Sequence, residues 1–281
     1  MPALPGYWIR FSLYRCMCYS ATVTLGQVPL VLLTAFVAGM MNSVAGGGTL
    51  VTFPTLLWLG VDPIRANVTC TVALWPGSLG AMVGFRRELG DSGRWMLLLG
   101  VPSIAGGLIG AGLLLLTPSR LFASIVPFLI LFATILFAAG EPITKRLARP
   151  ADSQSQVERT PARTWWIGAI VFQFVVAIYG GYFGAGMGIL MLAALGLMGL
   201  SDIHQMNGLK NFFAVCINVV ASAYFIISGQ VEWSYALVMV VGAIAGGYGG
   251  AGLARKLGRR FVRRAVIVIG LGMAVSLLFR G

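Results

Sequence analysis

A lysine stands among asparagines in an otherwise apolar stretch of this chain. Asn207, Asn211 and Asn218 recur at the three- and four-residue spacing that places side chains on one stripe of a helix, and Lys210 lies at the edge of that stripe. A lysine held in an apolar interior costs about 2.5–3.5 kcal/mol unless it is paired or hydrated. A bound anion would supply the missing charge; the alternatives are a side chain that snorkels to the surface or a pair with Asp202.

Two glycine tracts interrupt apolar sequence at matching positions, at residues 46–48 and 184–188. Glycine lets a ligand approach the backbone, and the segments that follow, from Thr49 and Ile189, would present unpaired N–H groups and a positive dipole end. Two such ends converging would attract an anion, and we favour this over a packing role for the two tracts. Close helix packing is the interpretation for the other paired glycines, Gly106, Gly110, Gly242, Gly246 and Gly250.

These observations define a candidate anion site. The tracts would offer backbone N–H groups, Asn67 and Asn207 would orient the ligand, and Lys210 would supply the charge. The first half has Cys70 where the second half has Lys210, so the site would be asymmetric. Its predicted members are Gly46, Gly47, Gly48, Thr49, Asn67, Thr71, Gly186, Met187, Gly188, Asn207, Lys210 and Asn211.

The residues needed for catalysis or metal binding are scarce. The 4 cysteines form no CxxC pair and there is 1 histidine, His204, so the sequence indicates no metal set and no cofactor. An intramembrane enzyme would need a nucleophile with a base, or a metal; we therefore expect no enzyme. His204 could be a proton-linked group, since an ordinary histidine titrates near neutrality, or an exposed loop residue.

Composition shows what surrounds these residues. Of 281 residues, 58% are hydrophobic and 10% charged, where a soluble domain has about 25% charged residues. The net charge of +12 comes from short basic clusters between apolar runs, which indicates membrane topology rather than nucleic-acid binding. The apolar runs are continuous, without the alternation of a membrane barrel, so we expect an all-α protein that crosses a bilayer many times. The clearest spans are 95–116, 121–139, 164–184, 233–254 and 262–279.

The chain matches itself at one constant offset, the repeat offset, at which Gly106-Gly107 pairs with Gly246-Gly247 and Asp62 with Asp202. Each copy contains about five helical segments, one of them short and preceded by glycines; in the first copy they are 25–44, 49–60, 66–85, 95–116 and 120–139. An odd number of segments predicts two inverted-topology repeats. We expect an N-terminal lead-in (1–24), repeat 1 (25–139), a cytoplasmic linker (140–163) and repeat 2 (164–281).

Loop charge supports the inversion. Basic clusters follow the third segment of the first copy (Arg86, Arg87, Arg94) and the fourth segment of the second copy (255–264). With the basic linker, all three fall on the cytoplasmic side and both termini outside. The first residues are interpreted as an interfacial lead-in to the first span, in preference to the start of a signal sequence.

The glycine tracts carry a resemblance to a known family. Residues 42–48, read as Asn-Ser-Val-Ala-Gly-Gly-Gly, with Leu50, Pro54, Gly60 and Asn67, resemble the TauE/SafE family of sulfite and sulfonate exporters, and residues 180–188 resemble them equally. The likeness runs from about residue 25 to the end. The second tract departs from the family pattern at Met187, where glycine is usual. It departs again at Ala194, where the match with Pro54 at the repeat offset leads us to expect proline. The resemblance implies export of sulfite or an organosulfonate such as sulfoacetate across the bacterial inner membrane.

Together these features predict a secondary transporter that moves a small anion by alternating access, because inverted repeats with broken helices are typical of such carriers. A passive anion channel and a structural membrane protein are the alternatives. The expected partners are the anion and the lipid bilayer, without nucleic acid; a homo-oligomer is allowed. The exact anion, the direction and the coupling ion do not follow from the sequence.

Overall fold

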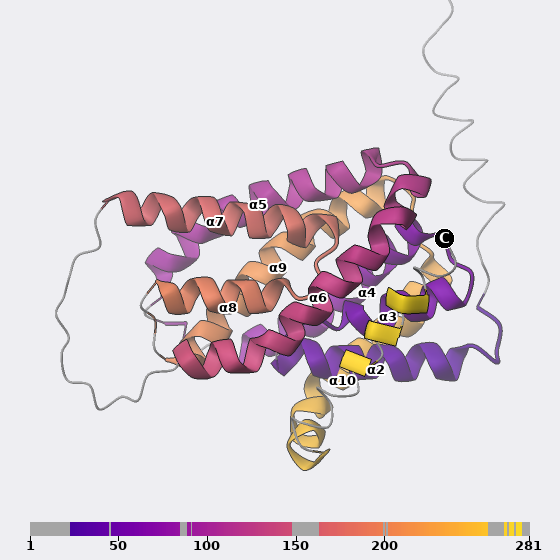
Figure 1. Ribbon diagram of the computed structural model, residues 1–281. Helices are drawn as coiled ribbons and strands as arrows, with labels where there is room; N and C mark the ends of the chain where they lie inside the picture. Colours follow the sequence, from indigo (N-terminus) through magenta and orange to yellow (C-terminus); the bar gives the residue numbers. More distant parts are fainter. Residues whose placement is uncertain are drawn as a thin grey trace, which may run out of the picture.

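A computed structural model describes residues 23–44, 46–84, 89–90, 92–147, 163–198, 200, 202–257, 267–268, 270–272 and 274–276. Throughout these ranges the regular structure is α-helical, as predicted. The helices, labelled as in Figure 1, are α2 (Val28–Val44), α3 (Thr49–Trp58), α4 (Pro63–Gly84), α5 (Gly93–Leu116), α6 (Ser119–Leu147), α7 (Arg163–Tyr182), α8 (Met187–Leu197), α9 (Ile203–Ile227) and α10 (Trp233–Leu257).

The helix bounds agree with the apolar segments at most ends. Helix α6 is the main difference: it continues to Leu147, past the predicted end at residue 139. A helix can continue into polar sequence because its backbone bonds are internal, so hydropathy marks where the apolar run ends and not where the helix ends. The lead-in before residue 23, the rest of the linker and the basic residues Arg86, Arg87 and 258–264 lie outside the described residues.

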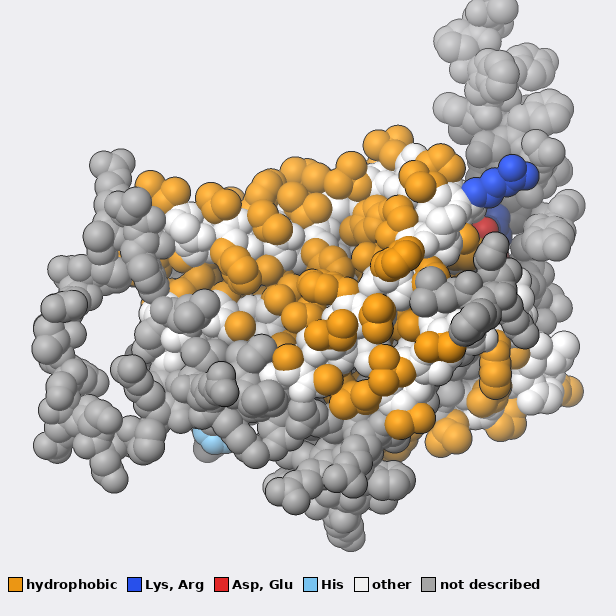
Figure 2. Space-filling view, in the orientation of Figure 1, with side chains coloured by type: hydrophobic (Ala, Val, Ile, Leu, Met, Phe, Trp, Pro, Cys, Tyr) orange, Lys and Arg blue, Asp and Glu red, His pale blue; other side chains and the backbone are white. Residues whose placement is uncertain are grey.

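The outer surface of the described helices is apolar. Side chains such as Leu97, Val101, Leu108 and Ile227 are well exposed, and Figure 2 shows hydrophobic side chains across the visible face, with the Lys, Arg, Asp and Glu side chains that it colours gathered near one end. Three helices, over residues 93–116, 119–139 and 204–227, are long and apolar enough to cross a membrane, and shorter apolar helices accompany them. A soluble monomer rarely exposes so continuous an apolar surface. The chain is a multi-pass membrane protein.

Two helical hairpins and two long central helices organise the interior. Helices α7 and α8 run antiparallel in Figure 1, and α2 and α3 are joined by the same kind of short glycine-containing connection. Helix α2 packs along α10, and α7 packs along α5; α4 and α9 pack against each other at the centre. Helices that correspond at the repeat offset thus have corresponding partners, as in a duplicated chain. The opposite orientation of the two copies in a membrane stays a prediction.

Small residues bring the outer helix pairs together. A Cβ on Gly106 would lie 2.7 Å from the carbonyl oxygen of Phe174 on α7, and one on Gly242 would lie 2.6 Å from the carbonyl oxygen of Leu32 on α2. Gly110 and Gly246 are packed against the same two helices more closely still. The packing interpretation is confirmed for these four glycines; the surroundings of Gly250 lie outside the described part.

Candidate functional site

The tips of the two hairpins are turns that only glycine adopts readily. Gly46 and Gly47 have φ values of 77° and 103°, and Gly184 and Gly186 have values of 76° and 78°. Both tracts bend through left-handed glycines, but only Gly46 and Gly186 correspond at the repeat offset; Met187, the counterpart of Gly47, is not left-handed and begins α8. The hydroxyl of Tyr179 holds this second tip by donating to the carbonyl of Ala185 at 2.6 Å.

The two tips meet inside the protein. A Cβ placed on Gly46 would lie 3.4 Å from the Cα of Gly188, so the backbones of the two tracts are almost in contact. An edge-to-face pair of Phe53 on α3 and Phe183 at the second tip, with ring centroids 5.4 Å apart, joins the hairpins beside this contact. The convergence of the two tracts, inferred from matched spacing, is present in the structure.

A small cavity lies between the hairpin tips and the central helices α4 and α9. Its volume of about 40 Å³ is enough for roughly three or four water-sized groups. The lining residues are Asn42, Gly46, Gly47, Thr49, Cys70, Thr71, Leu74, Ser78, Phe183, Gly184, Met187, Gly188, Lys210, Asn211, Ala214 and Asn218.

Lys210 is the cationic residue of this lining. Its side chain is 1% exposed, and its Nζ has no hydrogen-bond partner in the described part of the chain. It therefore does not snorkel to the surface. Asp202 is not its partner either, because that carboxylate lies at the exposed start of α9 and accepts the backbone N–H of His204 at 2.8 Å. Both alternatives to an anionic partner for this lysine are wrong.

The parts of α4 and α9 that line the cavity correspond to each other. Both helices use the same four positions, spaced one, three and four residues apart, which form one stripe of a helix. Every member on α4 has its counterpart one repeat offset later on α9: Cys70 with Lys210, Thr71 with Asn211, Leu74 with Ala214 and Ser78 with Asn218. The cavity thus has similar shapes on its two sides and different chemistry, with the charge on α9.

The backbone N–H groups at the tips are used differently in the two tracts. In the first, the N–H of Gly48 donates to Oδ1 of Asn42 at 2.8 Å, so it is not available to a ligand and Gly48 does not line the cavity. In the second, Tyr182 stands where an equivalent asparagine would be, and its hydroxyl lies 3.3 Å from that of Thr117. The N–H of Gly188 makes no hydrogen bond within the described residues, and Gly188 lines the cavity.

Eight of the twelve predicted site residues line the cavity, and four do not: Gly48, Asn67, Gly186 and Asn207. Asn67 is turned away because its Nδ2 donates to the carbonyl of Tyr182 at 2.8 Å, which ties α4 to the second tip. Asn207 lies nearly one helical turn before Lys210 and is not part of the lining. Gly186 faces Ala133 on α6 and not the cavity. His204 is exposed and also lies outside the lining.

Sequence reasoning missed part of the lining. Asn218 already stands on the polar stripe of α9, and Ser78 is its counterpart at the repeat offset on α4, so the spacing could have added both to the site. Asn42 has a weaker signal: it is an asparagine just before a glycine-rich helix start, where side-chain caps are common. Nothing in the sequence marks Phe183 and Gly184 as site residues except their position in or next to the second glycine tract. Leu74 and Ala214 are apolar and would have been predicted to be core residues.

Comparison with known proteins agrees with this picture. The family model described as "Sulfite exporter TauE/SafE" matches residues 31–277. A "Probable membrane transporter protein ORF9" of Sinorhizobium is 27% identical over 87% of this chain and 89% of its own. A "Probable membrane transporter protein" of Haemophilus influenzae is 28% identical, over 87% and 91%. YunE of Bacillus subtilis, also named a probable membrane transporter protein, is 27% identical over 90% and 97%. No solved structure matches the chain significantly.

Proposed function

We propose, from the premise that this chain belongs to the TauE/SafE family of membrane transporters, that it carries a small inorganic oxyanion, sulfite first among the candidates, by alternating access. The observation that supports this most is the buried Lys210 ammonium in a cavity whose described lining contains no acidic residue. A buried cation without a counter-charge is costly, so a site that keeps one is suited to a ligand that brings the opposite charge.

The neutral donors around Lys210 fit an oxyanion. Asn42 uses its Oδ1 to accept the N–H of Gly48, which leaves its Nδ2 as the group that an anion can meet. Nδ2 of Asn211 is buried and has no hydrogen-bond partner among the described residues. The N–H of Gly188, which has no hydrogen-bond partner among the described residues, adds a backbone donor from the second tip. The hydroxyl of Thr71 already donates to the carbonyl of Asn67 at 3.0 Å and is not one of these donors. Preorganised neutral donors with a single cation suit an anion of low charge.

The size of the cavity distinguishes between the candidate anions. A volume of about 40 Å³ suits a compact oxyanion of a few atoms. Sulfoacetate, which adds a carboxymethyl group to the sulfur, needs more room than sulfite. This supports sulfite ahead of organosulfonates as the cargo. The export direction is inferred from the family description alone.

The enclosed position of the site favours a carrier over a channel. Lys210 is 1% exposed, so an anion bound at its Nζ would be largely withdrawn from water. A carrier passes through such a state, whereas a conducting pore offers a continuous path. Inverted repeats around the site would supply two related ways of opening it.

The test is transport by the purified protein in proteoliposomes. We expect labelled sulfite to enter in exchange for unlabelled sulfite inside, and flux to saturate with concentration. Lys210→Met should abolish this exchange, while Cys216→Ala, on the same helix and outside the cavity lining, should leave it intact. Equal exchange by the Lys210→Met protein would remove the lysine from the site. Flux that neither saturates nor exchanges would favour the channel.

A further inference from the structure

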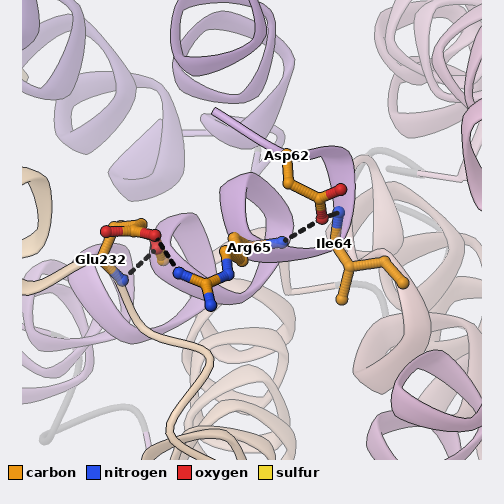
Figure 3. Close-up of polar contacts among 5 residues, drawn as sticks. Asp62, Ile64, Arg65 and Glu232 are labelled. Carbon is orange, nitrogen blue, oxygen red and sulfur yellow. Dashed lines mark hydrogen bonds and ion pairs between the residues drawn. The ribbon is translucent and has the colours of Figure 1, made fainter. Parts of the chain in front are cut away.

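An ion pair joins the start of α4 to the start of α10 (Figure 3). Nη1 of Arg65 lies 2.5 Å from Oε1 of Glu232, and the two side chains are 24% and 4% exposed. The backbone N–H of Glu232 also donates to Oγ1 of Thr69 at 3.0 Å. Asp62 fixes the end of α4 by accepting the backbone N–H groups of Ile64 and Arg65. Two polar contacts thus join α4 to the residue before α10, and two more cap the start of α4 itself.

The corresponding corner at the other repeat is held by neutral groups. Gln205 is the counterpart of Arg65 at the repeat offset, and Ser92 is the counterpart of Glu232. Nε2 of Gln205 donates to Oγ of Ser92 at 2.9 Å. Asp202 caps α9 there as Asp62 caps α4. The two corners are therefore built alike, except that one is closed by an ion pair and the other by a neutral hydrogen bond.

These corners lie at opposite ends of the cavity. Arg65 precedes the cavity residue Cys70 by five residues, and Gln205 precedes Lys210 by five, which is about 7.5 Å along each helix. Arg65 at the start of α4 meets Glu232, just beyond the end of α9, while Gln205 at the start of α9 meets Ser92, in the connection beyond α4. The two central helices are consequently antiparallel, and one contact lies toward each end of the cavity.

From this arrangement we infer that the Arg65–Glu232 pair and the Gln205–Ser92 hydrogen bond are the closures of the two ends of the transport pathway, and that the ionic closure is the stronger. The inference rests on the proposed alternating-access function. A charge-assisted hydrogen bond between largely buried groups is roughly twice as strong as a neutral one. The empty carrier therefore opens preferentially at the Gln205 end, and the Arg65 end opens less often.

The test measures which end of the cavity opens, independently of transport. The parent protein keeps Cys70 as its single thiol, with Cys16, Cys18 and Cys216 replaced by serine, and is labelled in vesicles with an impermeant methanethiosulfonate added to one side. In a cysteine-free background, Gln230→Cys marks the Arg65 side and His204→Cys marks the Gln205 side. Protection of Cys70 by sulfite reports occupation of the cavity.

Two reciprocal double variants exchange the closures. Arg65→Gln with Glu232→Ser gives the Arg65 end the neutral contact, and we expect labelling of Cys70 from that side to rise about tenfold. Gln205→Arg with Ser92→Glu gives the other end an ion pair, and labelling from the Gln205 side should fall by a similar factor. Arg65→Glu with Glu232→Arg, which restores a pair in reversed order, should label like the parent.

The inference is overturned if folded samples of either exchange variant label at the parental rate from both sides, since an ion pair that only stabilises the fold would leave accessibility unchanged. The two exchange variants act on different ends, so each decides the matter alone should the other not fold. Failure of the proposed function gives a different result: the parent protein would show neither sulfite exchange nor protection of Cys70, whatever the labelling rates of the variants.

Discussion

Cys70 on α4 and Lys210 on α9 line the same cavity from positions one repeat offset apart in the sequence. Both are buried, the first at 0% and the second at 1% exposure. The cavity therefore has a charged wall and an uncharged wall in places that are equivalent by position. A bound anion should accordingly lie nearer α9 than α4.

Replacing Lys210 by methionine should separate function from stability. The substitution keeps the length of the side chain and removes its charge, so sulfite binding should weaken by about ten- to a hundredfold, the value of one charged hydrogen bond. Stability should stay equal or rise, because an uncompensated buried cation is removed. Calorimetric titration and the thermal midpoint in detergent measure the two effects. A lower midpoint with unchanged binding would show that the lysine is structural.

Exchanging the two residues should move the charge to the other wall. In Cys70→Lys with Lys210→Cys, the new lysine would enter the same cavity from α4, so sulfite binding should recover to within about tenfold of the natural protein. Cys70→Lys alone places two like charges side by side and should lower the thermal midpoint. If the exchanged protein binds no better than Lys210→Met, the two walls are not equivalent in the way that the offset indicates.

Asn42 offers a substitution that alters the cavity and keeps the turn. In Asn42→Asp the side chain still accepts the N–H of Gly48, but a carboxylate oxygen replaces the Nδ2 donor. We expect exchange of sulfite to fall at least about tenfold by charge repulsion, with the thermal midpoint preserved. Asn42→Ala should lower both, since the cap is lost. Normal exchange by the aspartate variant would mean that Asn42 serves the turn alone.

Two neighbouring glycines on α5 provide a matched pair for packing. Gly110 faces the backbone of α7 without room for a Cβ, whereas a Cβ on Gly112 would meet open space. Gly110→Ala should destabilise the protein by about 1–3 kcal/mol through overpacking. Gly112→Ala should change stability by less than about 1 kcal/mol, toward greater stability, from helix propensity. Unfolding in mixed micelles compares them; equal effects would contradict the packing of α5 on α7.

Much of the fold was predictable from the sequence, because apolar runs and the glycines that interrupt them determine helix positions over short stretches of chain. The short helix α3 begins at Thr49, directly after the first glycine tract, whereas α8 begins at Met187, inside the second tract and two residues before the predicted start. Lys210, Thr71 and Asn211 were also predictable, since polar residues at helical spacing in an apolar run have few reasons to be there. The repeat offset also pairs predicted residues of the two walls, Thr71 on α4 with Asn211 on α9.

What the sequence could not give is the partner of each polar group. Asn67 was expected to orient the ligand, yet its amide donates to the carbonyl of Tyr182, 115 residues away. Gly48 was expected to offer its N–H, but Asn42 already accepts it. Such pairings depend on side-chain rotamers and on segments brought together by folding, which spacing alone does not encode. For the same reason the two helix-end contacts at Arg65 and Gln205 were not foreseen.

The near contact of Gly46 with Gly188 limits how this protein can acquire a new cargo. Because no side chain separates the two loops, a Cβ on Gly46 would already touch the backbone of Gly188, and a larger side chain there would press on it. Widening the cavity for a bulkier molecule would thus require coordinated substitutions in both glycine tracts. Laboratory selection for larger cargo should yield linked pairs of changes, one from each loop, far more often than single ones.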